Sequence, residues 1–505
     1  MHENREFDKS LKFIARSSIF VLLGIVISKV FTYIQRIIVA RYYGAEVYGL
    51  FSLSFMLTNL FLIFACMGLN QGITRFGAFY QGKNKLSKIR YLSRFTLRTM
   101  FCLSIFSSLL LFSLSNLISN NLFHNPDLSL FIKIFAFTIP FSALTAYFLG
   151  FLRAYEKIAL SSFISNIAPN VLEVVFLVIF IIIGIGGYSI PLSYVFASII
   201  TLFLAYLFGK KFSFQKIYGS DLKKEEKSII KKEILRYSVP LLFFGVINTI
   251  FLWIDSFQLG IFKTAREVGI YNVAGPTAFI ISLTGVFLFS LFPIITKEYG
   301  QKRTEIIKET SKQINKWIAI INVPIFIIIF IFPEAIIGAL FGKEFLLAST
   351  ALRILSVGSL FYASFELSNN LLLMIGKTKL ILYDAVIACL INIVLNYILI
   401  PAHTVFGVEN SLGINGAAFA TTISLVFLNL LFVFQVKKYL KFTPFRRKLI
   451  NVFLALIIPA ILITIIKQVT NQNLFGAILL VILFLLIYFL LLIVFKAFDK
   501  NDLMI

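Results

Sequence analysis

Cysteine, histidine and acidic side chains are scarce in this chain of 505 residues. It has three cysteines, three histidines and 23 acidic residues, against 47 lysines and arginines. Cys66, Cys102 and Cys389 all fall within apolar runs and have no CxxC spacing, so we expect reduced, packed thiols. The histidines form no zinc-ligand motif. We therefore expect neither a disulfide framework nor a metal site.

Motifs of nucleotide hydrolysis and of cleaved export signals are also missing. No GxxxxGK[ST] loop occurs, so an ATP-driven pump would need a separate subunit. The first apolar run follows four cations, as a signal peptide would, but it is too long and no A-x-A cleavage site follows it. We expect this segment to stay in the mature protein, and we expect no cofactor.

Apolar residues are abundant instead. They make up 59% of the chain, charged residues make up 14%, and the mean hydropathy is +0.92. Runs of about 20 apolar residues, each long enough to cross a bilayer as a helix, recur along the chain. The strands of a porin-type barrel would alternate every second residue, which these runs do not. The sequence therefore predicts an all-α polytopic membrane protein.

Fourteen such runs can be assigned as transmembrane helices. Their approximate bounds are 14–42, 46–72, 97–119, 128–152, 158–184, 190–209, 236–262, 268–296, 315–335, 346–375, 380–401, 413–436, 449–467 and 475–496.

The basic residues are concentrated on one side of these spans. Of the 47 lysines and arginines, 38 lie on loops that share a side with the N-terminus. The positive-inside rule then predicts a multi-pass protein of the plasma or inner membrane with both termini in the cytoplasm. The net charge of +24 is a topology signal that also attracts anionic lipids, and we expect no nucleic-acid partner.

The predicted outer loops are short, the longest having about a dozen residues near Pro401 to Leu412. A membrane glycosyltransferase or polymerase would be expected to carry clustered carboxylates on a larger outer loop, or a metal site. Neither is present in the sequence, so we expect a protein that is not an enzyme.

An internal repeat has a period near 220 residues. The segment Ala45 to Phe51 recurs as Ala265 to Tyr271, and Tyr80 to Lys83 recurs as Tyr299 to Lys302. Each copy holds six spans, so both copies enter the membrane in the same direction. This predicts two pseudo-symmetric six-helix bundles, with a central cavity between them, plus two C-terminal helices.

The predicted domains follow from this repeat. They are an N-terminal lobe at 1–209, a cytoplasmic linker at 210–235, a C-terminal lobe at 236–436, and the last two helices with a cytoplasmic tail at 437–505. The linker has mixed charges at helical spacing, which suggests a surface helix on the inner leaflet. Pro240 and Pro276 are placed to break the seventh and eighth helices.

The first span carries two cations, Lys29 and Arg36, seven residues apart and so on one face of the helix. A charge within the bilayer marks a functional site unless it snorkels or is paired. The repeat maps Lys29 onto Asn248 and Arg36 onto Asp255. We expect these two stripes to line the cavity, although Arg36 could instead snorkel, and Asp255 could neutralise it in a structural pair.

Other polar residues lie within or near the spans. The carboxylates Glu173, Glu366 and Asp384 are candidates for ion coupling, with coupling to a proton, Na⁺ or membrane potential left open. Asn170 and Asn392 could contact substrate or form helix-packing hydrogen bonds. Arg75 lies near the cytoplasmic exit, where it could bind substrate or only mark topology.

Two stacked cations at low dielectric attract phosphate or diphosphate, whereas asparagines and tyrosines supply the hydrogen bonds that sugars need. A lipid diphosphate sugar has both groups, and its tail can stay in the bilayer.

Three short motifs stand out: Tyr48 to Leu53, Gly68 to Phe76 and Gly413 to Thr422. They are similar to motifs of the polysaccharide-transporter (Wzx-type) flippases of the multidrug/oligosaccharidyl-lipid/polysaccharide exporter superfamily. The resemblance covers essentially the whole chain. It implies two six-helix bundles and two peripheral helices that move undecaprenyl- or dolichyl-linked oligosaccharide outward by alternating access.

The resemblance also implies partners and site residues. The substrate would be the lipid-linked oligosaccharide, in contact with membrane lipids, and a polysaccharide polymerase or glycosyltransferases could act beside the protein. Cavity cations are a feature of such flippases, which we carry over to Lys29, Arg36 and Arg75. The alternatives are a lipid II flippase, a cation-coupled multidrug exporter of the same superfamily, and a membrane scaffold or acyltransferase.

Overall fold

The computed structural model describes residues 2–213, 222–287, 295, 298–301, 303–401, 403–405, 408–410, 412–445, 449–469, 474–495 and 497. The chain forms two compact units, residues 1–269 and 270–505. Parts of the predicted linker, of the eighth span and of the C-terminal tail lie outside the described residues.

The first unit is helical throughout its described residues. Its helices are α1 (His2–Cys66), α2 (Leu69–Gly82), α3 (Leu86–Leu117), α4 (Leu128–Ala136), α5 (Thr138–Ala154), α6 (Ile158–Ser162), α7 (Ala168–Ile183), α8 (Ser189–Ser213), α9 (Lys224–Phe262) and the start of α10 (Ala265–Ala278), with the short turns η1 (Ile118–Leu122), η2 (Phe163–Ile167) and η3 (Gly186–Tyr188).

The second unit continues from α10 and adds one small hairpin. Its elements are η4 (Phe279–Phe287), α12 (Thr304–Ile331), α13 (Pro333–Leu340), η5 (Lys343–Leu347), α14 (Ala348–Met374), α15 (Thr378–Leu399), β1 (His403–Val405), β2 (Val408–Asn410), α16 (Ile414–Leu440), α17 (Leu449–Val469) and α18 (Leu474–Val494). The hairpin pairs β1 with β2 in the loop that the sequence placed on the outer side.

The membrane-spanning character of the fold is confirmed. Within the described residues, twelve helices are long and apolar enough to cross a membrane, judged by length and composition. The first of these, Leu23–Gly82, contains two of the fourteen predicted spans. The predicted span at 268–296 lies partly outside the described residues. The sequence-based prediction of about fourteen spans therefore agrees with this architecture.

A single glycine separates the first two spans. The chain turns within α1 at Gly44, where φ is 80° and ψ is −178°. A positive φ of this kind strains residues that carry a Cβ, so glycine suits the position. Because of this kink, the half of α1 after Gly44 can return along the half before it.

The linker and the seventh span form one helix, which the sequence analysis had divided at residue 235. α9 runs without interruption from Lys224 through Pro240 to Phe262, so the expected break at Pro240 is absent. The helix expected in the linker is present from Lys224 on, as an extension of the span beyond its apolar part. Pro276 behaves as expected, since α10 ends at Ala278 and continues as the 3₁₀ segment η4.

Two copies of the repeated motif pack against each other within the first unit. A Cβ placed on Gly49 would lie 1.7 Å from the carbonyl oxygen of Ala265, and one placed on Gly269 would lie 2.0 Å from that of Ala45. Small residues four apart on each helix allow this close backbone approach. The sequence repeat is therefore also a reciprocal contact in space.

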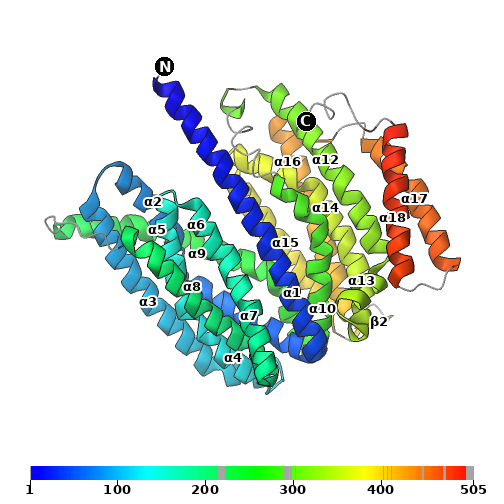
Figure 1. Ribbon diagram of the computed structural model, residues 1–505, viewed down its shortest axis with the longest axis horizontal. Coiled ribbons are helices and arrows are strands. Elements are labelled where there is room, and N and C mark those ends of the chain that lie inside the picture. Colours follow the sequence, from blue (N-terminus) through cyan, green and yellow to red (C-terminus); the bar gives the residue numbers. More distant parts are fainter. Residues whose placement is uncertain are drawn as a thin grey trace. The chain divides into compact units, whose positions relative to one another are not determined.

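The C-terminal helices α17 and α18 lie side by side and pack on α12 (Figure 1). Their core includes Val452, Phe484 and Tyr488, and the Tyr488 hydroxyl donates to the carbonyl of Ile320 at 3.0 Å. In the first unit, a separate core joins α2, α3, α5, α8 and α9 around Leu69 and Tyr147. This core fixes the helices that carry the candidate site.

Candidate functional site

Arg36 is held by tyrosines from both sides of the α1 kink. Its Nη1 donates to the hydroxyl of Tyr48 at 3.4 Å, and Tyr48 is fully buried. Tyr33 and Tyr194 also lie near its guanidinium. The turn at Gly44 therefore brings a buried tyrosine from the second span to a cation of the first.

Lys29 lies two turns before Arg36 on the same face of α1, close enough for the two positive charges to repel each other. It is exposed, and it makes no ion pair within the described part of the chain. A lysine on a membrane span without a carboxylate partner is costly unless it faces a water-filled space or a ligand. Lys29 is thus available to bind an anion.

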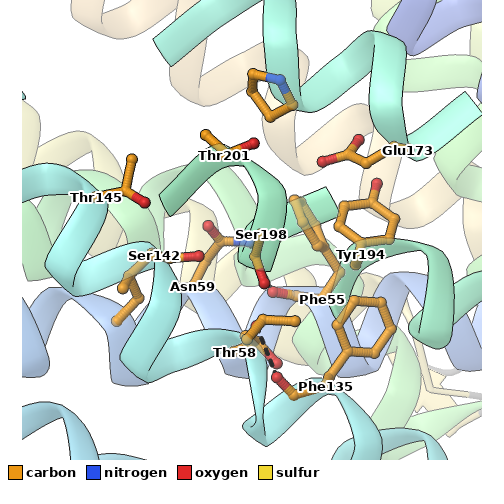
Figure 2. A pocket seen from close by; sticks show the side chains of 13 residues that line it. Phe55, Thr58, Asn59, Phe135, Ser142, Thr145, Glu173, Tyr194, Ser198 and Thr201 are labelled. Carbon is orange, nitrogen blue, oxygen red and sulfur yellow. Dashed lines mark hydrogen bonds between the residues drawn. The ribbon is translucent and has the colours of Figure 1, made fainter. Parts of the chain in front are cut away.

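Tyr194 on α8 connects Arg36 to a separate cavity. Its hydroxyl donates to Oε1 of Gln35, the residue beside Arg36, at 3.1 Å. Figure 2 shows that this hydroxyl points toward the carboxylate of Glu173 on α7, with which it interacts electrostatically. One tyrosine therefore hydrogen-bonds to the residue beside Arg36 and points its hydroxyl toward a carboxylate.

The cavity beside Tyr194 has a volume of about 150 Å³ and is lined by helices α1, α4, α5, α7 and α8 (Figure 2). Its polar lining is rich in oxygen: Thr58, Asn59, Thr138, Ser142, Thr145, Glu173, Tyr194, Ser198 and Thr201. Aromatic rings of Phe55 and Phe135 close part of the wall. Glu173 is the only carboxylate among the lining residues.

Several of these hydroxyls donate their hydrogen bond to a backbone carbonyl of their own helix. Thr58 donates to the carbonyl of Ser54 at 2.8 Å, and Thr145 donates to that of Phe141 at 2.9 Å. Such back-bonded hydroxyls leave only lone pairs to face the cavity. The Oγ1 of Thr201 is buried without a hydrogen-bond partner among the described residues. The cavity therefore suits a proton, a water or a small cation held by oxygen atoms.

Asn170 fastens α7 to α1 on either side of Lys29. Its Nδ2 donates to Ser28 Oγ at 3.0 Å and to the carbonyl of Asn166, and its Oδ1 accepts from Thr32 Oγ1 at 2.8 Å. Both donors of the amide are thus used within the protein. The contacts of Asn170 are therefore hydrogen bonds between packed helices, one of the two roles expected for it.

The amides of the second unit have a similar packing role. Asn392 on α15 donates to Thr421 Oγ1 on α16 at 3.0 Å and accepts from Asn396 at 3.0 Å. Asp384 accepts from Nε2 of Gln435 at 2.7 Å. These residues form a polar ladder between α15 and α16.

Glu366 on α14 lies against the backbone of η4. A Cβ placed on Gly285 would come within 2.2 Å of its Oε2, so a side chain at residue 285 would displace this carboxylate. The backbone carbonyl of Glu366 accepts from Asn370 Nδ2 at 3.0 Å.

The structure places the remaining predicted residues on α9 and α2. Asn248 is exposed and Asp255 is buried, seven residues apart on α9, which packs against α1 in the same unit. Arg75 on α2 is exposed, with its guanidinium 4.4 Å from the ring centroid of Tyr237 on α9. Arg75 therefore belongs to the junction of α2 with α9.

Sequence reasoning missed most of the cavity. Glu173 was found because a carboxylate in an apolar run is conspicuous, whereas Asn59, Ser198 and Thr201 were not singled out. Small hydroxyls are common in membrane helices, and spacing alone does not show which of them face one another across five helices.

Comparison with known proteins gives two family matches. A family model described as "Polysaccharide biosynthesis protein" matches residues 14–298, and one described as "MatE" matches residues 240–398.

Individual relatives extend this picture. The chain is 26% identical to the uncharacterized membrane protein MJ1375 of Methanocaldococcus jannaschii over 85% of this chain and 99% of that protein. It is also 26% identical to the probable low-salt glycan biosynthesis flippase Agl15 of Haloferax volcanii, over 38% of this chain and 39% of that protein. Among solved structures, the inward closed conformation of the lipid II flippase MurJ superposes with a TM-score of 0.73 at 18% identity, covering 96% of this chain and 100% of that one.

Proposed function

We propose that this chain, which belongs to the polysaccharide biosynthesis protein family matched over residues 14–298, is a flippase for a lipid-linked oligosaccharide. The chain is a multi-pass transporter of the multidrug/oligosaccharidyl-lipid/polysaccharide superfamily. Within that class, the observation that carries the proposal is the cationic stripe on α1. Lys29 makes no ion pair among the described residues, and Arg36 is held in place by Tyr48. This stripe is suited to a diphosphate.

In this proposal, Lys29 and Arg36 hold the diphosphate while the polyprenyl tail stays in the bilayer. Charge-assisted hydrogen bonds to phosphate oxygens are strong where water is excluded. Asn248 and Asp255 on α9 line the path of the sugars, whose hydroxyls both donate and accept hydrogen bonds. Asn170 and Asn392 act as positioning residues, because their amides are used between helices.

The Glu173 cavity supplies the coupling in this scheme. A proton or small cation bound to Glu173 changes the charge beside Tyr194, and Tyr194 in turn contacts Gln35 and the Arg36 charge. Occupancy of the cavity can thereby bias the state of the cationic stripe. Glu366 and Asp384 have second-unit partners or contacts that suit a structural role better.

The working arrangement follows from the same proposal. The protein lies in the plasma or inner membrane with both termini cytoplasmic, and it moves its substrate outward by alternating access. The substrate is supplied by glycosyltransferases on the cytoplasmic side and is consumed by a polymerase or glycosyltransferase outside.

The proposal is tested by replacing the two cations of the stripe on α1. The variants Lys29→Gln and Arg36→Gln should each reduce surface glycan in cells that depend on this chain, and the double variant should abolish it. The protein level in the membrane should stay the same, as measured by immunoblot. Lys210→Gln, at the exposed end of α8, is the matched control and should leave glycan unchanged. Unchanged glycan in the double variant would sink the assignment.

The second candidate is a cation-coupled multidrug exporter. Two observations favour it: the "MatE" family match over residues 240–398 and the carboxylate cavity around Glu173. This function predicts that expression raises resistance to cationic dyes and that Glu173→Gln removes the resistance. A flippase would alter glycan and leave dye resistance at the level of the empty vector.

A further inference from the structure

The extension of α9 beyond its apolar part carries a groove that the proposed function does not use. The groove has a volume of about 750 Å³. Its lining runs along α9 from the cations Lys231, Lys232 and Arg236 to the apolar Val239 and Pro240, with Ser228 and Leu235 completing it. All seven residues belong to one face of a single helix, on turns that follow one another.

Two acidic residues of α9 contact helices of the first unit: Glu226 lies 3.9 Å from Lys88 Nζ on α3, and Glu233 accepts from the Tyr80 hydroxyl on α2 at 3.3 Å. A third, Glu225, is exposed one turn before Ser228, on the helix face that carries the groove. The three groove cations make no ion pair within the described part of the chain, and no carboxylate is among the residues that line the groove. The lining therefore has three cations and no acid.

Aromatic contact accounts for one of these cations only in part. The Nζ of Lys231 lies 6.0 Å from the ring centroid of Phe95 on α3. This contact orients the ammonium group without satisfying its hydrogen-bond donors. Lys232 and Arg236 are exposed, so all three cations can reach a ligand in the groove.

The apolar end of the groove leads into the membrane span. After Arg236, the helix carries no charged residue until Asp255. Phe243 and Phe244 continue the exposed surface, with 61% and 53% of their areas accessible. Pro240 cannot donate a backbone hydrogen bond, so the carbonyl four residues earlier, that of Arg236, lacks its usual partner. The groove is thus cationic toward the start of α9 and apolar toward the membrane span.

We infer that this groove is a loading site where the diphosphate of the lipid-linked substrate docks from the cytoplasmic leaflet before it enters the transporter. The inference rests on the proposed function and names where the substrate is first captured. Lys231, Lys232 and Arg236 bind the diphosphate oxygens, and the polyprenyl chain lies along Val239, Pro240 and Phe243. A diphosphate carries more charge than the single phosphate of a phospholipid, so three uncompensated cations favour it.

The experiment measures binding of radiolabelled geranylgeranyl diphosphate to the full chain in nanodiscs of neutral lipid. It is done in the K29Q/R36Q background, so that the α1 stripe does not contribute. The groove variant K231Q/K232Q/R236Q should weaken binding about tenfold or more. The control K223Q/K224Q/K227Q removes three charges from the same helix outside the groove and should change binding less than about twofold.

Three further measurements keep the result interpretable. The charge-conserving variant K231R/K232R/R236K should keep most of the affinity, which excludes misfolding as the cause of loss. Inorganic diphosphate should compete poorly, because it has no chain to bury. Nanodiscs that contain phosphatidylglycerol should compete only weakly.

Specific outcomes would overturn the inference. Equal losses in the groove and control variants would mean bulk electrostatic attraction. Full displacement by phosphatidylglycerol would identify a general anionic-lipid site, and full displacement by inorganic diphosphate a free-anion site. The proposed function is judged separately, because export in the K29Q/R36Q variant tests the stripe whether or not the groove binds the probe.

Discussion

A carboxylate of the first unit faces a cavity, whereas one of the second unit is hydrogen-bonded to a side chain of the neighbouring helix. Glu173 faces a cavity lined with back-bonded hydroxyls, and Thr201 has no partner there among the described residues. Asp384 is hydrogen-bonded to Gln435, and Asn392 to Thr421, between α15 and α16. Two carboxylates on membrane helices therefore have different surroundings.

This difference shows why spacing alone does not identify a functional residue. The repeat aligns Asn170 with Asn392, and both occur at helix interfaces. The helix that each one fastens differs: Asn170 fixes α1, which carries Lys29 and Arg36, whereas Asn392 fixes α16. The role of each amide follows from the helix that it holds.

The two units should differ most in the effect of removing a carboxylate, Glu173 in the first unit and Asp384 in the second. Glu173→Gln should lower transport at least about tenfold, which corresponds to about 1.4 kcal/mol, because the amide cannot change charge beside Tyr194. Asp384→Asn should lower it less than about twofold, since an amide can still hydrogen-bond to Gln435. The measurement is uptake of a labelled lipid-linked oligosaccharide into proteoliposomes with an imposed ion gradient. Equal losses in the two variants would show that both units take part in coupling.

A second test compares the two amides at equal structural cost. Asn170→Ala removes the hydrogen bonds to Ser28 and Thr32, and Asn392→Ala removes those to Thr421 and Asn396. Each should lower the free energy of unfolding by about 1–3 kcal/mol. Only Asn170→Ala should also lower transport by more than its stability loss explains, because it releases α1. Thermal unfolding in detergent and transport in proteoliposomes, measured on the same preparations, separate the two effects.

Much of the fold could be predicted from the sequence because membrane helices must bury their backbone polar groups within long apolar runs. The parts that could not be predicted lie where backbone and side-chain signals diverge. α9 continues unbroken from charged Lys224 into the apolar span, since the helical hydrogen-bond ladder does not depend on side-chain polarity. The turn at Gly44 is a single residue, too short to interrupt an apolar pattern.

The candidate site was predicted only where charge made it visible. Lys29, Arg36 and Glu173 stand out because each is costly within an apolar run. Their connection through Tyr194 depends on how α8 packs against α1 and α7, and a tyrosine in a Phe-rich helix carries no signal of that contact. The sequence thus identified the charges, and the packing identified the tyrosine between them.

The smallest expected effect concerns Glu334, which lies on α13 between two candidate spans, and its partners Arg353 and Lys467 near the ends of neighbouring helices. Glu334 on α13 lies 2.9 Å from Arg353 Nη2 and 3.4 Å from Lys467 Nζ. Burial opposes its ionisation, but a backbone hydrogen bond and the two cations together hold the pKa of Glu334 below its usual value of 4.5. A carboxyl whose pKa is depressed on folding stabilises the protein above its unfolded pKa and loses this contribution as pH falls through its folded pKa.

Lowering the pH from 6 toward 4 and below should therefore narrow the difference in the free energy of unfolding between the native chain and Glu334→Gln. Because the cluster is half exposed, the difference at pH 6 should be only about 0.5–1 kcal/mol. Thermal unfolding of both proteins across this pH range measures this difference. Plots of stability against pH that run parallel for the two proteins would mean that the cluster adds no stability of its own. In that case α17 is held by its apolar contacts with α12 alone.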